Sequence, residues 1–151
     1  MEKFHEKLKV LRKKKGLTQQ EVADKIGINR PSYSNWEKGR REPSFENLSM
    51  LACIFDVSID YLLGDYLEIS KERYLEIKES GLMKTSNVFP QRLKELRLKK
   101  RLTQIELGEK VGVKQSTFTK WENGKREPNF ETLLKLADSL EVSLDWLFGR
   151  E

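Results

Sequence analysis

The sequence is poor in the residues that build catalytic and metal sites. Among its 151 residues there is one cysteine, Cys53, and one histidine, His5. A single cysteine excludes an internal disulfide and a cysteine-based zinc site. The carboxylates form no pair suited to acid–base chemistry beyond those expected at helix caps. We therefore expect a protein that is not an enzyme and that binds no metal ion or cofactor.

Long apolar runs are absent as well. No stretch approaches the roughly 20 apolar residues needed to cross a bilayer, and the start Met1-Glu2-Lys3 does not open a signal peptide. We also expect no ligand-sensing domain beyond the segments described below. These absences predict a soluble cytoplasmic protein with no membrane partner and no small-molecule ligand.

What the chain does contain is an internal repeat. Residues 4–65 align with residues 89–150 without a gap, and about 29 of about 62 positions are identical. The structural unit is therefore a module of roughly 60 residues, a size that folds with little margin. We expect one domain over residues 1–65, a linker over 66–88 and a second domain over 89–151.

The positive charge belongs to the repeated modules. Lys and Arg number 29 against 24 Asp and Glu, which gives a net charge of +5. The excess lies in the two copies and not in residues 66–88. It favours a polyanionic partner, although a solvated helix face explains any single lysine equally well.

Each copy predicts five short helices and no strand. Thr18 and Thr103 each stand three residues before a glutamate, which is the capping box at the start of a second helix. A third helix is expected over 30–38 and 115–123, with its paired aromatic side chains in the core. The predicted N-cap residues are Thr18, Asn29, Ser44 and Ser58 in the first copy, and Thr103, Lys114 (a poor cap), Asn129 and Ser143 in the second.

The second and third helices of each copy resemble a known DNA-binding motif. Two helices joined by a short glycine-containing turn form a helix-turn-helix, whose second helix enters the major groove. The motifs Thr18-Gln19-Gln20-Glu21 and Trp36-Glu37-Lys38-Gly39, repeated as Thr103-Gln104 and Trp121-Glu122-Asn123-Gly124, resemble the phage-repressor (XRE-type, lambda-repressor-like) family. The resemblance implies an all-α protein with two five-helix lambda-repressor-like DNA-binding domains joined by a helical linker.

The resemblance also implies which residues read the bases. In that family the exposed N-terminal part of the third helix contacts base edges. Arg and Lys suit guanine, whereas Asn and Gln suit adenine. The base-reading residues would be Asn29, Arg30, Ser32 and Asn35 in the first copy, and Lys114, Gln115, Thr117 and Lys120 in the second.

Two further sets of residues follow from the same resemblance. Gln19 and Gln104 resemble the family's phosphate-anchoring glutamine, at a helix N-terminus that favours anions. Further phosphate contacts, which supply affinity but no sequence information, are expected from Lys38, Arg40, Asn123 and Lys125. A structural ion pair typical of the family would join Arg12 to Glu37 and Arg97 to Glu122.

The segment over residues 66–88 does not repeat. Its mixture of apolar and charged residues is compatible with one more helix that ends near Ser80-Gly81. Two interpretations stay open. The helix is either a spacer that packs on the first module, or a contact over residues 66–80 through which two chains form a homodimer.

The leading hypothesis is a sequence-specific regulator of transcription that binds double-stranded DNA in the nucleoid. It would act as a repressor on an operator with two half-sites, one for each recognition helix. Because the reading residues differ between the copies, the half-sites would differ too. The alternative is a protein-interaction regulator, of the antitoxin or anti-repressor type, with secondary DNA binding.

Overall fold

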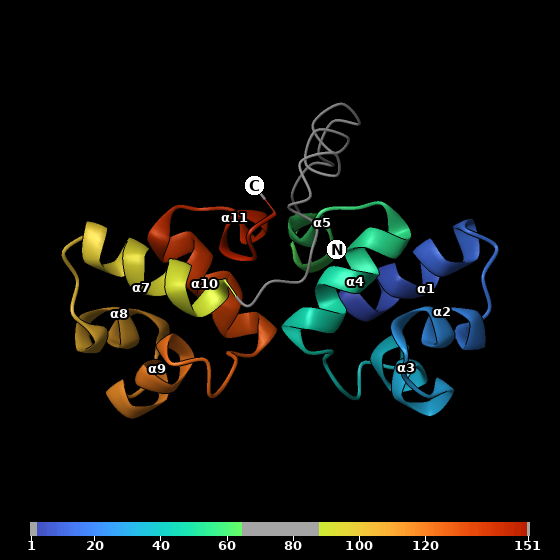
Figure 1. Ribbon diagram of the computed structural model, residues 1–151, viewed down its shortest axis with the longest axis horizontal. Coiled ribbons are helices and arrows are strands. Elements are labelled where there is room, and N and C mark those ends of the chain that lie inside the picture. The colour runs from blue at the N-terminus through green and yellow to red at the C-terminus, as the bar shows by residue number, and fades with distance from the viewer. Residues whose placement is uncertain (1–2, 65–87, 151) are drawn as a thin grey trace. The chain divides into compact units, whose positions relative to one another are not determined.

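The computed structural model describes residues 3–64 and 88–150, which form two compact units, one from each copy of the repeat. Each unit consists of five α-helices joined by short turns, and neither described range contains a strand. Figure 1 shows both units. The prediction of an all-α fold is confirmed. The predicted linker helix and homodimer contact over residues 66–80 lie outside the described residues.

The helices of the two units correspond one to one (Figure 1). The first unit contains α1 (Phe4–Lys14), α2 (Gln19–Ile26), α3 (Arg30–Glu37), α4 (Phe45–Phe55) and α5 (Ile59–Leu63). The second contains α7 (Phe89–Lys99), α8 (Gln104–Val111), α9 (Gln115–Glu122), α10 (Phe130–Leu140) and α11 (Leu144–Leu147). The third helices end one residue earlier than expected, because Lys38 and Asn123 are their C-cap residues.

Both predicted capping boxes are present at the start of α2 and α8. The Thr18 hydroxyl accepts a hydrogen bond from the Glu21 amide at 3.1 Å, and the Thr18 amide donates to the Glu21 carboxylate at 3.2 Å. The corresponding distances between Thr103 and Glu106 are 3.0 and 3.2 Å. These bonds satisfy backbone groups that a helix start leaves without partners. They hold the N-terminus of each second helix in a defined position.

The second and third helices are joined by a turn that needs glycine. Gly27 ends α2 at a φ of +86°, and Gly112 ends α8 at +79°. Both values lie in the left-handed region that other residues rarely adopt. The chain therefore reverses within a few residues, and α3 and α9 pack directly against the helices that precede them.

The core of each unit contains the aromatic side chains of the third helix. Tyr33 and Phe118 are completely buried, and Trp36 and Trp121 are 6% and 2% exposed. The ring centres of Tyr33 and Trp36 lie 5.9 Å apart, and those of Phe118 and Trp121 lie 5.5 Å apart. This confirms the prediction that these aromatics are core residues. They fix the third helix to the rest of its unit, since a buried aromatic side chain contributes much of a small domain's packing.

One basic side chain joins the first helix of each unit to the last. The Lys7 ammonium donates to the carbonyl oxygens of Tyr61 at 2.8 Å and Gly64 at 2.5 Å, and it lies 5.1 Å from the Tyr61 ring centre. In the second unit Arg92 donates to the Trp146 carbonyl and lies 4.6 Å from its ring centre. A cation suits the carbonyl end of a helix. Lys7, only 7% exposed, is therefore not part of a solvated basic face.

Candidate nucleic-acid interface

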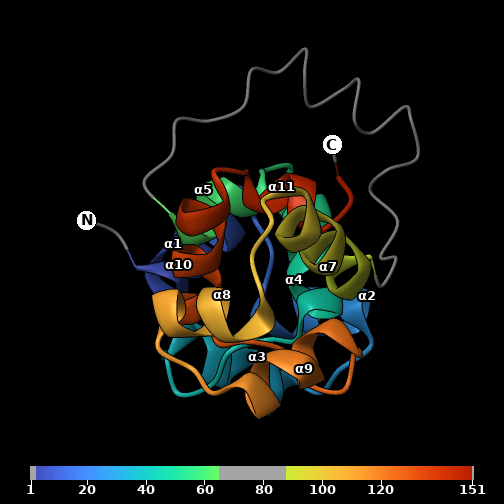
Figure 2. The ribbon, with the colours of Figure 1, turned by 90° about the vertical axis from the view of Figure 1, so that its left-hand side faces the viewer.

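In each unit the second and third helices pack together as a helix-turn-helix. Figure 2 looks onto the second unit and shows α9 at its lower edge, with α11 at the upper edge. The third helix also contacts the first helix of its own unit. It is thus held on one face by two other helices, and its opposite face is left for solvent or a partner.

The inner face of α3 is fixed by a buried ion pair. Arg12 on α1 and Glu37 at the end of α3 meet through two hydrogen bonds, at 2.6 Å from Nε and 3.2 Å from Nη2. The remaining guanidinium nitrogen, Nη1, donates to the Leu17 carbonyl at 3.0 Å. Only 13% of the Arg12 side chain and 4% of the Glu37 side chain are exposed. A two-point contact of this kind fixes orientation as well as distance.

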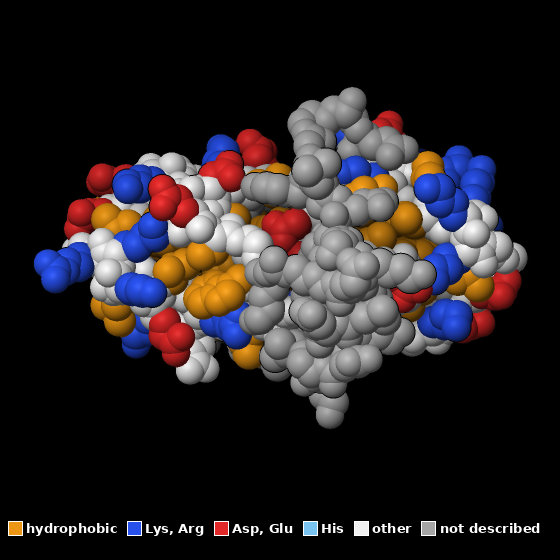
Figure 3. Space-filling model, turned by 90° about the horizontal axis from the view of Figure 1, so that it is seen from above, with side chains coloured by type: hydrophobic (Ala, Val, Ile, Leu, Met, Phe, Trp, Pro, Cys, Tyr) orange, Lys and Arg blue, Asp and Glu red, His pale blue; other side chains and the backbone are white. Residues whose placement is uncertain are grey.

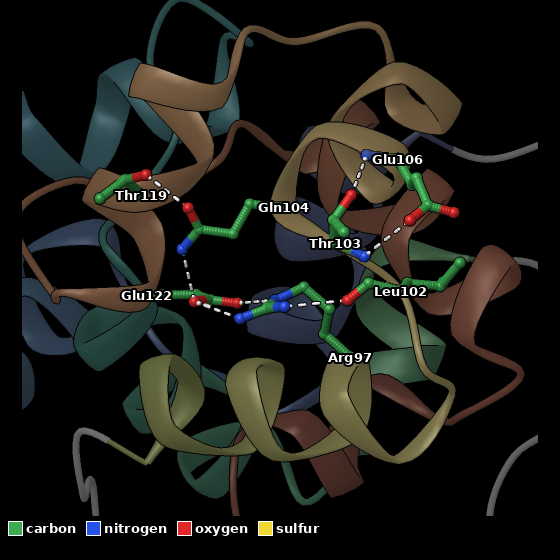
Figure 4. Close-up of polar contacts among 7 residues, drawn as sticks. All are labelled: Arg97, Leu102, Thr103, Gln104, Glu106, Thr119 and Glu122. Carbon is green, nitrogen blue, oxygen red and sulfur yellow. Dashed lines mark hydrogen bonds and ion pairs between the residues drawn. The ribbon is translucent and has the colours of Figure 1, made fainter.

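The second unit contains the same arrangement. Arg97 reaches Glu122 through Nε at 2.6 Å and Nη2 at 3.2 Å, and it donates to the Leu102 carbonyl at 2.9 Å. Figure 4 shows these side chains between α7 and α9. The Arg97 side chain is 9% exposed and the Glu122 side chain is 3% exposed. The third helix of each unit is therefore tied at its C-terminal end to the first helix of that unit.

The ionised form of this pair is favoured in the first unit. Burial raises the pKa of Glu37, but hydrogen bonds from Arg12 and Gln19, together with the nearby Tyr33 hydroxyl, outweigh it, so that the pKa is lowered below its usual value. The hydrogen bond with Glu37 raises the pKa of Arg12, against the effect of burial. Both groups are therefore charged at neutral pH, as a buried pair must be to keep its hydrogen bonds.

A buried hydroxyl lies beside this pair in the first unit only. The Tyr33 hydroxyl makes no hydrogen bond of normal geometry within the described residues, although Glu37 and Arg12 are close enough to act on it. Burial, with the nearby Glu37 carboxylate, raises the pKa of Tyr33 well above its usual value. The second unit has Phe118 at this position and avoids the buried hydroxyl.

Gln19 and Gln104 occupy the first position of α2 and α8 and are half-buried. Each side-chain amide donates inward to the buried glutamate, at 2.9 Å to Glu37 and 2.8 Å to Glu122. A glutamine amide carries two N–H groups. Each amide therefore has a second N–H besides the one bonded to the glutamate, and each glutamine links the second helix to the third.

Of the base-reading residues expected from the sequence, Asn29 and Lys114 are the N-cap residues of α3 and α9, and the other six lie on these helices. Most are exposed, and Ser32, Asn35 and Thr117 are half-buried. Within residues 3–64 and 88–150 their side chains form no ion pair, and only Asn29 is engaged, because it caps α3 by accepting from the Ser32 amide at 2.8 Å. Polar groups without internal partners are the ones that a ligand can engage. The exposed or half-buried set is Asn29, Arg30, Ser32, Asn35, Lys114, Gln115, Thr117 and Lys120.

The residues expected to contact phosphates follow the C-terminal ends of the reading helices. Lys38 and Asn123 cap α3 and α9, and Arg40 and Lys125 stand two residues further on. All four are exposed. Since the only carboxylate on either helix is the one in the ion pair, this part of each unit carries a local excess of positive charge.

In each unit the face opposite the third helix is different in character. Figure 3 shows it, with Lys and Arg side chains interspersed with Asp and Glu side chains and with some apolar surface. Mixed charge of this kind favours no polyanion. In each unit the face that carries the third helix is therefore the better candidate for a nucleic-acid interface.

Two other features, a metal-binding cluster and a membrane-spanning helix, are absent from the described residues. Across residues 3–64 and 88–150 no three His, Cys, Asp or Glu side chains are grouped so as to hold a metal ion. None of the helices in these ranges has the length and apolar character needed to cross a membrane.

Comparison with known proteins identifies relatives among bacterial and phage regulators. Over 60 residues the chain is 55% identical to the uncharacterized HTH-type transcriptional regulator YqaE of Bacillus subtilis, covering 40% of this chain and 52% of that protein. It is 39% identical over 89 residues to the HTH-type transcriptional regulator ImmR of the same species, covering 59% and 66%. It is 40% identical over 48 residues to the cryptic phage CTXphi transcriptional repressor RstR of Vibrio cholerae, covering 32% and 43%.

These matches are partial. The chain spans about half the length of the first of these relatives, and no solved structure matches it significantly. The family model described as helix-turn-helix, in contrast, matches twice, at residues 8–62 and 93–147. The two matches cover most of the chain and coincide with the two units of the structure. The chain therefore belongs to the helix-turn-helix family, with two copies of its domain in tandem.

Proposed function

We propose that this protein is a sequence-specific regulator of transcription that binds double-stranded DNA through α3 and α9. One observation carries the proposal. In both units the inner face of the third helix is fixed by a buried ion pair, and its outer face carries polar side chains without ion-pair partners among the described residues. A rigid helix with an exposed polar edge is what reading the major groove requires.

The two reading edges differ, so we propose a target with two unlike half-sites. Arg30 and Asn35 in the first unit suit guanine and adenine, whereas Lys114, Gln115 and Lys120 in the second present another order of donors and acceptors. Exposed Lys38, Arg40, Asn123 and Lys125, with Gln19 and Gln104, would contact phosphates and set the register. Members of this family are generally non-enzymatic, and we propose no reaction for this chain.

We propose that the regulatory effect is repression, as the name of the relative RstR states for that protein. A bound helix-turn-helix protein can block a promoter by occupying it. Because it works on chromosomal DNA, we expect it in the cytoplasm, at the nucleoid. A reporter gene placed behind the selected target separates repression from activation, since the two change expression in opposite directions.

The test is selection of bound sites from random duplexes, followed by the variants Arg30→Ala and Gln115→Ala. Each variant is expected to lose about 1–3 kcal/mol of discrimination at its own base positions. Lys125→Ala removes a proposed phosphate contact. It should weaken binding to every sequence and reduce the slope of log affinity against log salt concentration by about one. Lys135→Ala removes the same charge from α10 and is the matched control, which should leave affinity unchanged.

Three outcomes would count against the proposal. Loss at the same base positions in both variants would exclude two distinct half-sites. Absence of duplex binding even at low salt would exclude DNA recognition and would favour a regulator of the antitoxin or anti-repressor type, which acts through another protein. Duplex binding that is equally strong for all sequences would leave a DNA-binding protein without sequence specificity.

A further inference from the structure

The two units differ in one hydrogen bond beside the proposed DNA surface. In the second unit the Thr119 hydroxyl on α9 donates to Oε1 of Gln104 at 2.8 Å, as Figure 4 shows. The first unit has Ser34 at the position of Thr119. Among the hydrogen bonds of residues 3–64 none joins the Ser34 side chain to Gln19. The glutamines that face the proposed phosphate are thus held differently.

The chemistry of the neighbours decides how the Gln104 amide is turned. Both oxygens of the Glu122 carboxylate accept hydrogen bonds from Arg97, so the Gln104 amide nitrogen, and not its oxygen, faces the carboxylate, at 2.8 Å. Arg97 holds that carboxylate by two bonds and prevents it from turning. The amide oxygen then points the other way, where the Thr119 hydroxyl donates to it. Both ends of the amide are engaged.

We propose that Thr119 is a positioning residue that locks the Gln104 amide as a hydrogen-bond donor toward a DNA phosphate, and that the first unit lacks this lock. The proposal rests on the proposed function for the identity of the anion. With its oxygen covered by Thr119, Gln104 offers its remaining N–H, which suits a phosphate oxygen. Gln19 keeps an open amide oxygen, so it can accept as well as donate.

The hydrogen bond from Thr119 reduces the conformational entropy that Gln104 loses when the protein binds DNA. A side chain that is ordered before binding loses less conformational entropy when it contacts its partner. Thr119 is suited to this because a β-branched residue on a helix has few χ1 rotamers, whereas serine has more freedom. The second unit therefore holds a phosphate with a preorganised donor. The first unit must order Gln19 on binding, and its contact depends less strictly on an anion.

The lock itself can be tested without DNA. In the full chain, NMR relaxation of the side-chain amide groups is expected to show a higher order parameter for Gln104 than for Gln19. Thr119→Val, which keeps the shape but removes the hydroxyl, should lower the Gln104 value to that of Gln19. Thr119→Ser should retain part of the order, and Ser34→Val should change neither. Equal order of the two amides in the unmodified chain would overturn the proposal.

The contribution to DNA binding is tested by a double-mutant cycle on the selected duplex. Thr119→Val is expected to weaken binding about two- to tenfold, the range for one net hydrogen bond. The same change in a Gln104→Ala background should have no further effect, because its target is gone. An equal loss in both backgrounds would mean that Thr119 contacts DNA by itself, and would overturn the positioning role. Ser34→Val is the matched control in the first unit and should leave affinity unchanged.

The two experiments separate two kinds of failure. If the chain binds no duplex at low salt, the proposed function fails together with the phosphate as the partner of Gln104. If the chain binds duplex but the two amides are equally ordered, the proposed function stands and the lock is wrong.

Discussion

Single residues decide how firmly each reading helix is held. Glu122 has 3% of its side chain exposed, and its partner Arg97 has 9%. A carboxylate removed from water to this degree is tolerated only while a cation and hydrogen-bond donors compensate for its lost hydration. The ion pair therefore makes each unit sensitive to the loss of either partner, more than it adds net stability over an apolar core.

Arg97→Ala is expected to lower the free energy of unfolding of the second unit by about 3–5 kcal/mol, because it leaves Glu122 buried without its cation. Lys100→Ala is the control in the same unit. It removes the ion pair between Lys100 and Glu141, in which nitrogen and oxygen lie 3.6 Å apart and the Glu141 side chain is 83% exposed. This change should lower the free energy of unfolding by less than about 1 kcal/mol. Urea denaturation, monitored by tryptophan fluorescence, measures both free energies of unfolding. Similar losses in the two variants would refute the distinction.

Tyr33 and Phe118 provide a residue-scale test that depends on pH. Folding raises the pKa of Tyr33 above the unfolded value of 10.0. The buried Tyr33 hydroxyl therefore does not reduce the stability of the first unit through its titration below about pH 10. As the pH rises further the stability falls, because only the unfolded chain then releases the Tyr33 proton easily. Tyr33→Phe should remove this alkaline loss from the first unit and should not destabilise it at pH 7.

The reverse change supplies the control. Phe118→Tyr buries a new hydroxyl in the second unit and is expected to cost about 1–3 kcal/mol at pH 7. Urea denaturation of both variants at neutral and alkaline pH measures the effects. If Tyr33→Phe retained the full alkaline loss, the buried Tyr33 hydroxyl would not be its source.

At the scale of helices, the two reading helices start differently. Asn29 caps α3 through its side chain, whereas Lys114 at the start of α9 makes no side-chain cap. Lys114→Asn should raise the free energy of unfolding of the second unit by about 1 kcal/mol, and Asn29→Ala should lower that of the first by a similar amount. Thermal unfolding measures both. An unchanged second unit, with the expected loss in the first, would show that α9 does not depend on its cap.

The helices are also the scale at which the sequence was most informative. Thr18, Thr103 and the glycines at 27 and 112 predict where the second helices begin and end, because caps and turns depend on neighbouring residues alone. The paired aromatics of the third helix were correctly predicted as core. The buried ion pairs followed only from the resemblance, since sequence cannot show a contact between residues 25 positions apart.

Other contacts were missed for the same physical reason. Lys7 and Arg92 lie on the first helix of each unit, yet they bind carbonyl groups of the last helix. The hydrogen bond from Thr119 to Gln104 depends on how two helices pack. The difference between Thr119 and Ser34 in the sequence does not by itself predict this bond. The repeat offered one usable signal, because positions that differ between otherwise similar copies are worth comparing in space.

For the whole molecule, the important property is that two units belong to one chain. Each has its own core and its own helix-turn-helix. Once one unit binds its half-site, the other is confined nearby and binds at a raised effective concentration. The complete target should therefore bind about 10²–10⁴-fold more tightly than either half-site alone. Fluorescence anisotropy with full and half-site duplexes measures the ratio, and equal affinities would mean that only one unit engages DNA.

The contacts of Lys7 and Arg92 also bear on how the protein is made. Each joins the first helix of its unit to the last, across 54 residues of sequence. During synthesis, α1 leaves the ribosome long before α5, so Lys7 has no carbonyl partner until its unit is almost complete. Chains generally fold domain by domain as they emerge, N-terminal domain first. The first unit can close before the ribosome has finished the second, which reduces the chance that a helix of one copy packs against the similar helices of the other.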